Sequence, residues 1–185
     1  MDGRGSWSFS LIRDMKNASN HIIRSDLAVI MRDKYPKSRH HFLVLPWNDI
    51  DTVYQLTRKD IPLLEEMHLL GTNAIELSRG QADDFKIGFH MKPSMHRLHL
   101  HVISKDFVSD RLKHKLHWNS FHTSFFMPFE CILAELEERG QIEHRPEQYI
   151  DNLLKTPLAC HRCDRKFTTM PALKKHLEGH LESFS

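Results

Sequence analysis

The 185-residue sequence has few cysteines, no long apolar segment and almost no net charge. Three cysteines in a chain without a secretory signal do not suggest a disulfide framework. No apolar run approaches the roughly eighteen residues of a membrane-spanning helix, so we expect no membrane partner. The N-terminus lacks a basic-then-apolar signal sequence, which favours an intracellular protein. A formal net charge of +2 argues neither for nor against a nucleic-acid partner.

The length and composition allow one ordinary domain plus a small module, with 40% apolar residues for a core. Apolar periodicity predicts helices near residues 8–18, 59–77, 128–139 and 146–155, and strands at 21–24, 27–32, 41–46, 85–90 and 98–104. This order indicates an α+β domain over residues 1–156. Thr156-Pro157 breaks the last helix and marks the boundary to a second domain, 157–185.

The stretch from His90 to Ser104 reads HMKPSMHRLHLHVIS and holds the clearest chemical pattern. Alternation on a strand puts Arg97, His99 and His101 on one face and the intervening leucines toward a core. Two imidazoles two residues apart on a strand lie roughly 7 Å apart, which suits two nitrogens around one phosphate. A solvated face or half of a metal site is the alternative interpretation.

This stretch resembles the motif of the histidine-triad family, His-φ-His-φ-His-φ-φ with φ apolar, except that Arg97 replaces the first histidine. The resemblance implies an antiparallel sheet with packed helices, and His99 as a nucleophile. We expect His101 to donate to a phosphate oxygen, and His90 and Ser94 to hold phosphates or protonate the leaving group. Arg97 is a fixed cation that cannot shuttle protons, so we expect it to bind a phosphate or the DNA backbone.

The loop before the strand at 41–46 supplies the other nucleotide-binding candidates. The same resemblance implies that Asp33 binds the ribose of a nucleotide, and a carboxylate can accept hydrogen bonds from two vicinal hydroxyls. Lys37 and His41 are expected near the same pocket. The alternative for this segment is a charged, solvated loop.

DNA-binding candidates lie before and after the histidine stretch. Residues 105–121 are rich in Lys, Arg and His and end in aromatics, a composition that suits a phosphate backbone, although a solvated loop is the alternative. We expect Lys113, Lys115 and Trp118 to contact DNA there. Trp7 is predicted either to anchor a core or to stack on a base.

The C-terminal region has the most specific signal in the chain. Two residues separate its two cysteines, twelve residues follow, and three residues separate its two histidines. This spacing matches a C2H2 zinc finger with the ligands Cys160, Cys163, His176 and His180. The sequence therefore predicts a small ββα finger that holds one structural zinc ion. So short a segment cannot bury enough surface to fold alone, so the metal must supply the folding energy.

The finger is not predicted to read a base sequence. The helix positions that would face bases hold Thr169, Ala172 and Lys175, which are poor bidentate partners for guanine or adenine. We expect contacts with the DNA backbone instead, through the basic residues Arg165, Lys166, Lys174 and Lys175.

The combination of a histidine-triad domain with one C2H2 finger resembles the aprataxin family over nearly the whole chain. The resemblance implies a nuclear enzyme that removes AMP from 5′-adenylated nicks or ends of double-stranded DNA through an adenylyl-histidine, with no metal needed for the chemistry. Vertebrate members also carry an N-terminal forkhead-associated domain, and we expect this chain to act without one. Two alternatives are a histidine-triad hydrolase of small nucleotides and a non-catalytic module that binds DNA ends.

Overall fold

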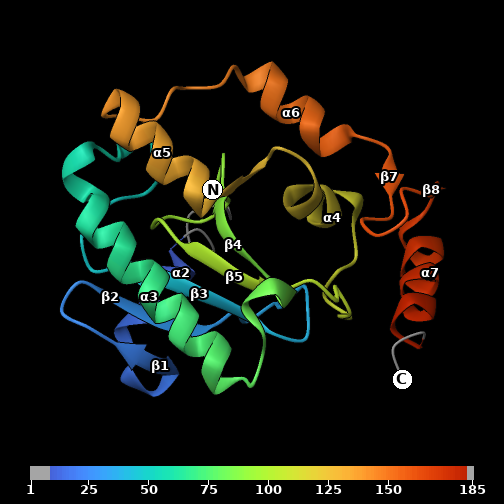
Figure 1. Ribbon diagram of the computed structural model, residues 1–185, viewed down its shortest axis with the longest axis horizontal. Coiled ribbons are helices and arrows are strands. Elements are labelled where there is room, and N and C mark those ends of the chain that lie inside the picture. Colours follow the sequence, from blue (N-terminus) through green and yellow to red (C-terminus); the bar gives the residue numbers. More distant parts are fainter. Residues whose placement is uncertain (1–8, 183–185) are drawn as a thin grey trace, which may run out of the picture.

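A six-stranded antiparallel sheet forms the centre of the computed structural model, which describes residues 9–182. Its strand order is β1-β2-β3-β5-β4-β6 (Figure 1). The strands are β1 His21–Arg24, β2 Ala28–Arg32, β3 His41–Pro46, β4 Phe85–His90, β5 Leu100–Ser104 and β6 Phe126–Pro128. The predicted α+β class and antiparallel sheet are therefore confirmed.

Helices cover both faces of this sheet. The long helix α3, Ile61–Leu77, packs its buried apolar side against one face, where β3 contributes Phe42 and Val44. The short helix α2, Ser10–Lys16, packs against the other face, where β3 contributes Leu43 and Leu45. Because successive side chains of a strand alternate, His41 lies on the α2 side of the sheet.

Close packing brings α3 directly against the back of β5. A Cβ atom on Gly71 of α3 would lie 2.8 Å from the Cγ2 atom of Val102, so only glycine fits at this approach. Val102 and Leu100 point into this core, which leaves His101 on the opposite face. The core on the α3 side of the sheet therefore supports β5, and the polar side chain of His101 lies on the α2 side.

Three more helices and one strand complete the larger domain, and only some of them were predicted from the sequence. Helices α5, Phe129–Arg139, and α6, Glu147–Lys155, match the predicted ones to within a residue, and Gly140 ends α5 with a φ of 78°. Helix α4, Lys115–His122, and strand β6 were not predicted. Single helical turns of 3-10 type complete the fold: η1 Ala18–Asn20, η2 Val53–Gln55, η3 Arg58–Asp60 and η4 Ala82–Asp84.

The finger has the predicted ββα order, with β7 Leu158–Ala159, β8 Lys166–Phe167 and α7 Met170–Glu182. It lies next to α4 at one end of the molecule (Figure 1). Its apolar residues, among them Leu173 and Leu177, share one buried cluster with Phe107, Trp118 and Phe121 of the larger domain. The finger is therefore docked on the rest of the protein. Within residues 9–182, no helix is both long enough and apolar enough to cross a membrane.

Candidate functional site

Three neighbouring strands bring a cluster of histidines together on the α2 side of the sheet. His41 comes from β3, His101 from β5 and His90 from the end of β4. The Nε2 atom of His41 lies 2.9 Å from the Nδ1 atom of His101, and the rings of His90 and His101 have centroids 4.2 Å apart. His99 lies just before β5, with its ring centroid 4.8 Å from that of His101.

The tautomer of His99 follows from its hydrogen bond. Its Nδ1 atom lies 2.8 Å from the carbonyl oxygen of Arg97, and a carbonyl can only accept. The Nδ1 atom therefore has the proton, and the Nε2 atom keeps its lone pair. Burial lowers the pKa of His99, so the ring is neutral near pH 7. A neutral imidazole with one free nitrogen is the form that can act as a nucleophile.

The proton of His101 can be placed by the same reasoning. The backbone N–H of Lys37 donates to the Nδ1 atom of His41 at 3.2 Å, so the Nε2 atom of His41 has the proton and donates to His101. The other nitrogen of His101, Nε2, must then be an N–H group when the ring is neutral. That atom is buried and has no hydrogen-bond partner among residues 9–182. His101 therefore offers an unused donor beside His99.

One cavity lies over this cluster and a second adjoins it. The first, of about 490 Å³, is lined by His90, His99 and His101 together with the cations Lys37, Lys92, Arg111 and Lys113. The second, of about 500 Å³, has apolar walls that include Leu11, Ile22, Met31 and Leu43. Asp33, Tyr35 and Met95 line both cavities. A cationic cavity thus adjoins a partly apolar one, with the carboxylate of Asp33 at their junction.

Most of the predicted nucleotide-site residues lie around the first cavity. Asp33, Lys37, His41 and Ser94 line it with the three histidines, and so does Lys113. The carboxylate of Asp33 accepts from the backbone N–H of Tyr35 at 2.6 Å and lies 3.3 Å from the Nδ1 atom of His41. Burial lowers the pKa of His41 to about 4. The structure brings these residues together, and their roles in binding and catalysis stay predictions.

Arg97 does not lie where the sequence placed it, and its predicted phosphate contact is wrong. The residue has a φ of 83°, so the chain leaves the extended conformation before β5 begins. Its side chain is buried away from both cavities, donates to the carbonyl oxygen of Asn48 and pairs with Asp49 at 3.0 Å. The shared face of Arg97, His99 and His101 would have required a strand through all three positions.

Trp118 also does not lie where its predicted contact with DNA requires it. Its side chain is 1% exposed, because it lies in the cluster between the larger domain and the finger. One face of the indole stacks on the ring of His122, with the centroids 3.6 Å apart. A buried ring cannot accept a base on its surface. Trp7 lies outside the described residues, and Lys115 is half-buried at the start of α4.

Sequence reasoning missed several side chains that surround the cluster. Phe121 packs against the rings of His41, His90 and His101, with centroids 4.7–5.6 Å away. Arg111 lies over the ring of Tyr35, 5.7 Å from its centroid, at the rim of the first cavity. The helical spacing of the apolar side chains Trp118 and Phe121 was the signal that could have revealed α4 and its inward face.

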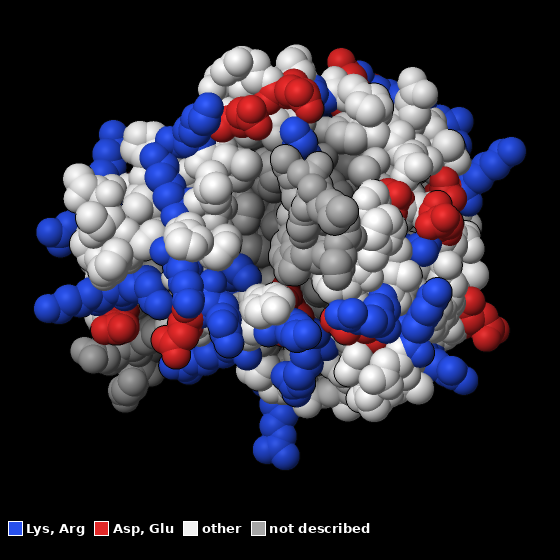
Figure 2. All heavy atoms as spheres, turned by 180° about the vertical axis from the view of Figure 1, so that it is seen from behind, with Lys and Arg blue, Asp and Glu red and all other residues white. Residues whose placement is uncertain are grey.

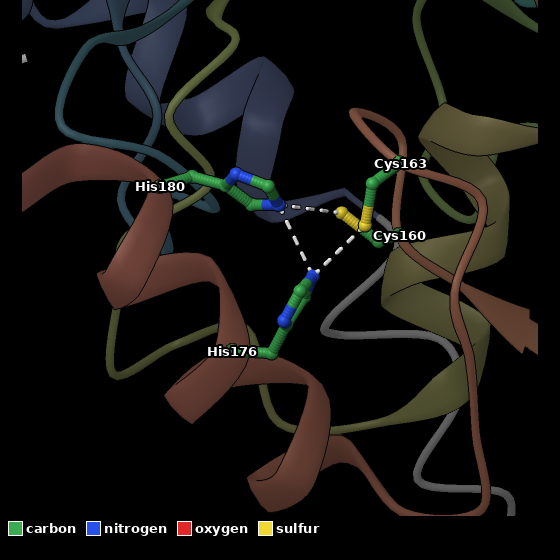
Figure 3. A group of neighbouring side chains, drawn as sticks. All are labelled: Cys160, Cys163, His176 and His180. Atoms are coloured by element: carbon green, nitrogen blue, oxygen red, sulfur yellow. Dashed lines mark hydrogen bonds between the residues drawn. The ribbon is translucent and has the colours of Figure 1, made fainter. Parts of the chain in front are cut away.

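The four predicted zinc ligands converge at the end of the finger (Figure 3). The Nε2 atom of His180 lies 3.4 Å from the Sγ atom of Cys160, that of His176 lies 3.2 Å from the Sγ atom of Cys163, and the two Nε2 atoms are 3.1 Å apart. Zinc bonds of about 2.0–2.3 Å in a tetrahedron imply edges of roughly 3.3–3.8 Å. The ligand set fits a closed, structural zinc site, and the three distances lie within or just below the range of these edges.

Basic side chains gather on the side of the molecule opposite to that of Figure 1. Figure 2 shows Lys and Arg along the lower part of this side and toward the finger. Arg165, Lys166 and Lys175 of the finger are exposed. Lys174 is only half exposed, because its Nζ atom donates to the carbonyl oxygen of Ser109 at 2.8 Å. Three of the four predicted backbone-binding residues of the finger are thus fully available to a polyanion.

Two family models match the chain. The first, described as the C-terminal binding domain of the scavenger mRNA decapping enzyme, matches residues 6–117. The second, described as a C2HE / C2H2 / C2HC zinc-binding finger, matches residues 122–183. The second match includes all four converging ligands, so the C-terminal module is a zinc-binding finger.

Individual relatives agree with both matches. An aprataxin-like protein of Drosophila melanogaster is 49% identical over 96% of this chain, and an aprataxin of Gallus gallus is 40% identical over 95% of it. The chain spans 27% and 55% of the lengths of these two proteins. The solved structure of Hnt3 in complex with DNA and guanosine has a TM-score of 0.71 and 26% identity, covering 98% of this chain and 97% of that one. With the histidine cluster and the finger, these matches show that the chain belongs to the aprataxin family of histidine-triad proteins.

Proposed function

We propose that the chain is a nuclear hydrolase that removes AMP from 5′-adenylated nicks or ends in double-stranded DNA. The observation that carries the proposal is the pairing of a free Nε2 lone pair on His99 with an unused N–H on His101 beside one cationic cavity. A nucleophile and a donor for the phosphate oxygen are the two groups that nucleotidyl transfer requires.

The proposed reaction has two steps. In the first, the Nε2 atom of His99 attacks the phosphorus of the adenylate, a nitrogen–phosphorus bond forms, and the bond to the DNA 5′-phosphate oxygen breaks. The Nδ1–H of His99 remains bonded to the Arg97 carbonyl, which stabilises the positive charge of the adenylyl-imidazole. In the second step, water attacks the same phosphorus, AMP leaves with the hydroxyl, and the remaining proton passes to solvent.

The two cavities support the choice of an adenosine nucleotide. With the phosphate at His99 and His101 and the ribose at Asp33, the base would lie in the second cavity against its apolar side chains. His90 and Ser94, which line the first cavity, would hold the remaining phosphate, and Lys37 would offset its charge. The proposed steps use no metal, and zinc at the finger has a structural role.

DNA is favoured as the carrier of the adenylate by the charged surface around the cavity mouth. Arg111 and Lys113 line the first cavity, the finger exposes further basic residues, and the related Hnt3 was solved in complex with DNA. Phosphate contacts of this kind position a duplex without reading its sequence. The size of the cavities alone would also suit a free mononucleotide, so hydrolysis of a small adenosine phosphoramidate is the second candidate.

The decisive experiment is incubation of the chain with a 5′-adenylated nicked duplex, followed by measurement of AMP release. We expect release with wild type, an acid-labile and base-stable adenylyl adduct on His99, and no turnover with His99→Asn. A preference of the wild type for the phosphoramidate over the adenylated duplex would favour the small-nucleotide function. An adduct on His101, or turnover by His99→Asn, would overturn the assignment of the nucleophile.

A further inference from the structure

Four consecutive residues, from Asn48 to Asp51, hold the short segment that precedes His99. The guanidinium of Arg97 donates to the carbonyl oxygen of Asn48 and pairs with Asp49 at 3.0 Å. The backbone N–H of Leu98 donates to the carbonyl oxygen of Ile50 at 2.7 Å, and that of Arg97 donates to the carboxylate of Asp51 at 2.8 Å. Every residue of the 48–51 segment thus binds residue 97 or 98.

Asp51 is itself held in place. Its backbone N–H donates to the side-chain oxygen of Gln55 at 2.6 Å, within the capping box of η2. The hydrogen bond from the Arg97 N–H lowers the pKa of Asp51, so this carboxylate stays ionised at neutral pH. The segment is therefore a preorganised acceptor for Arg97.

The backbone of Arg97 requires such support. A φ of 83° is the left-handed region, which costs a non-glycine residue of order 1 kcal/mol or more unless its surroundings hold it. This conformation turns the N–H of Arg97 toward Asp51 and its carbonyl oxygen toward the Nδ1 atom of His99, 2.8 Å away. The same residue thus contacts the 48–51 segment on one side and the proposed nucleophile on the other.

We propose that Arg97 is a positioning residue, whose side chain, anchored on Asn48 and Asp49, fixes the carbonyl oxygen that sets the orientation and tautomer of His99. This inference rests on the proposed function only in its kinetic part, because the rate that Arg97 would alter is the rate of the proposed reaction. The guanidinium acts at a distance from the substrate, because it lies outside both cavities. It therefore affects which nitrogen of His99 has the proton, and not how tightly a phosphate binds.

The test is Arg97→Gly, because glycine adopts a positive φ without strain and deletes only the side-chain anchor. Arg79→Gly is the matched control, since Arg79 is also a positive-φ arginine, with a φ of 58°, and is exposed after α3. Long-range proton–nitrogen spectra of the imidazoles report the tautomer of His99, whose signals are assigned by their loss in His99→Asn. We expect a single Nδ1–H form in wild type and Arg79→Gly, and a mixture of tautomers in Arg97→Gly.

Kinetics supply the second readout. Misplacement of a reacting group by about 1 Å can cost roughly a hundredfold, so we expect a loss approaching that size in the single-turnover rate of adduct formation. The affinity for AMP should stay within roughly threefold, as for a residue that makes no ground-state contact. Burial lowers the pKa of His99 and the Arg97 hydrogen bond opposes this, so the acid limb of the pH–rate profile should move to lower pH in Arg97→Gly.

An unchanged tautomer of His99 in Arg97→Gly would overturn the proposal, whatever the rate. If Arg97→Gly fails to fold, Asp49→Ala removes the carboxylate that pairs with the Arg97 guanidinium and should shift the tautomer in the same direction. Inactivity of wild type on adenylated DNA would instead contradict the proposed function, and the spectra would still report on Arg97.

Discussion

The indole Nε1 atom of Trp118 donates to the carbonyl oxygen of Ala159 at 3.1 Å, so helix α4 holds the first strand of the finger directly. One helical turn farther along, Phe121 contacts three of the four histidines of the cluster, His41, His90 and His101. The next residue after Trp118, Asn119, donates to the carbonyl oxygens of Leu154 and Thr156 at 2.9 and 2.7 Å. One helix therefore connects the finger, the α6 end and the candidate catalytic site.

Trp118 should contribute strongly to stability. Trp118→Phe removes the N–H, leaves the Ala159 carbonyl without its partner and replaces the indole by a smaller ring, which should cost about 1–3 kcal/mol of unfolding free energy. Trp118→Ala also leaves a cavity and should cost about 3–5 kcal/mol. Urea unfolding measures both values, with the exposed Tyr149→Ala as the control that should change little. Equal costs for the two Trp118 variants would contradict the role of packing.

Removal of zinc should affect more than the finger. Chelation should unfold β7, β8 and α7, and it should lower the unfolding midpoint of the larger domain, because both share the cluster around Trp118 and Phe121. Cys160→Ser should reproduce the effect. Cys131→Ser is the matched control, since Cys131 is exposed on α5 and is not a ligand. An unchanged midpoint of the larger domain in Cys160→Ser would show that the two parts are energetically independent.

Stability should fall as the solution becomes acidic. His41 has a folded-state pKa of about 4, below the ordinary value of 6.5, so the unfolded chain binds more protons between these values. The contribution of His41, about 3 kcal/mol, is complete above pH 6.5 and is lost as the pH falls toward 4. Burial also lowers the pKa of His101 and of His90, which adds to the slope. Thermal unfolding of His41→Gln should show a shallower pH dependence than wild type, and identical slopes would contradict the assignment.

Salt dependence can test the finger as a contact for the DNA backbone. Each phosphate contact contributes about 0.9 to the slope of log affinity against log salt, so Arg165→Ala with Lys166→Ala should reduce the slope by up to about 1.8. The double variant Lys59→Ala with Arg79→Ala removes the same charge from exposed positions beside α3. Equal slopes for the two double variants would mean that the finger residues act only through overall charge.

The parts of the fold that were predictable are those with a local pattern. The buried strand His41–Pro46 and the long helix α3 were found by apolar runs and helical spacing, and the zinc ligands by their separation along the chain. Helix α4 was not found, because the few apolar residues of this basic stretch did not show a clear helical period. The burial of Trp118 depends on a finger that begins about forty residues later, and no local pattern reports such docking.

Most residues of the site could be predicted from the sequence, but their arrangement within the site could not. Alternation correctly put His101 opposite the core-facing Leu100, since both lie within β5. It failed at Arg97, where contacts with residues 48–51 impose a left-handed conformation on the chain. The proton positions of His99 and His101 depend on the carbonyl oxygen of Arg97, in the turn before β5, and on the backbone N–H of Lys37, in the loop before β3, neither of which the sequence alone places.

The place of Asp33 between two cavities has a consequence for which bond would break. In the proposed reaction, a ribose held by this carboxylate would lie at a fixed reach from His99, so the phosphorus nearest the sugar, and not the next one, would meet the Nε2 atom. Water would then attack that same phosphorus when the adduct is resolved. In water enriched in heavy oxygen, the label should consequently enter AMP, and the DNA 5′-phosphate should keep the oxygens with which it arrived.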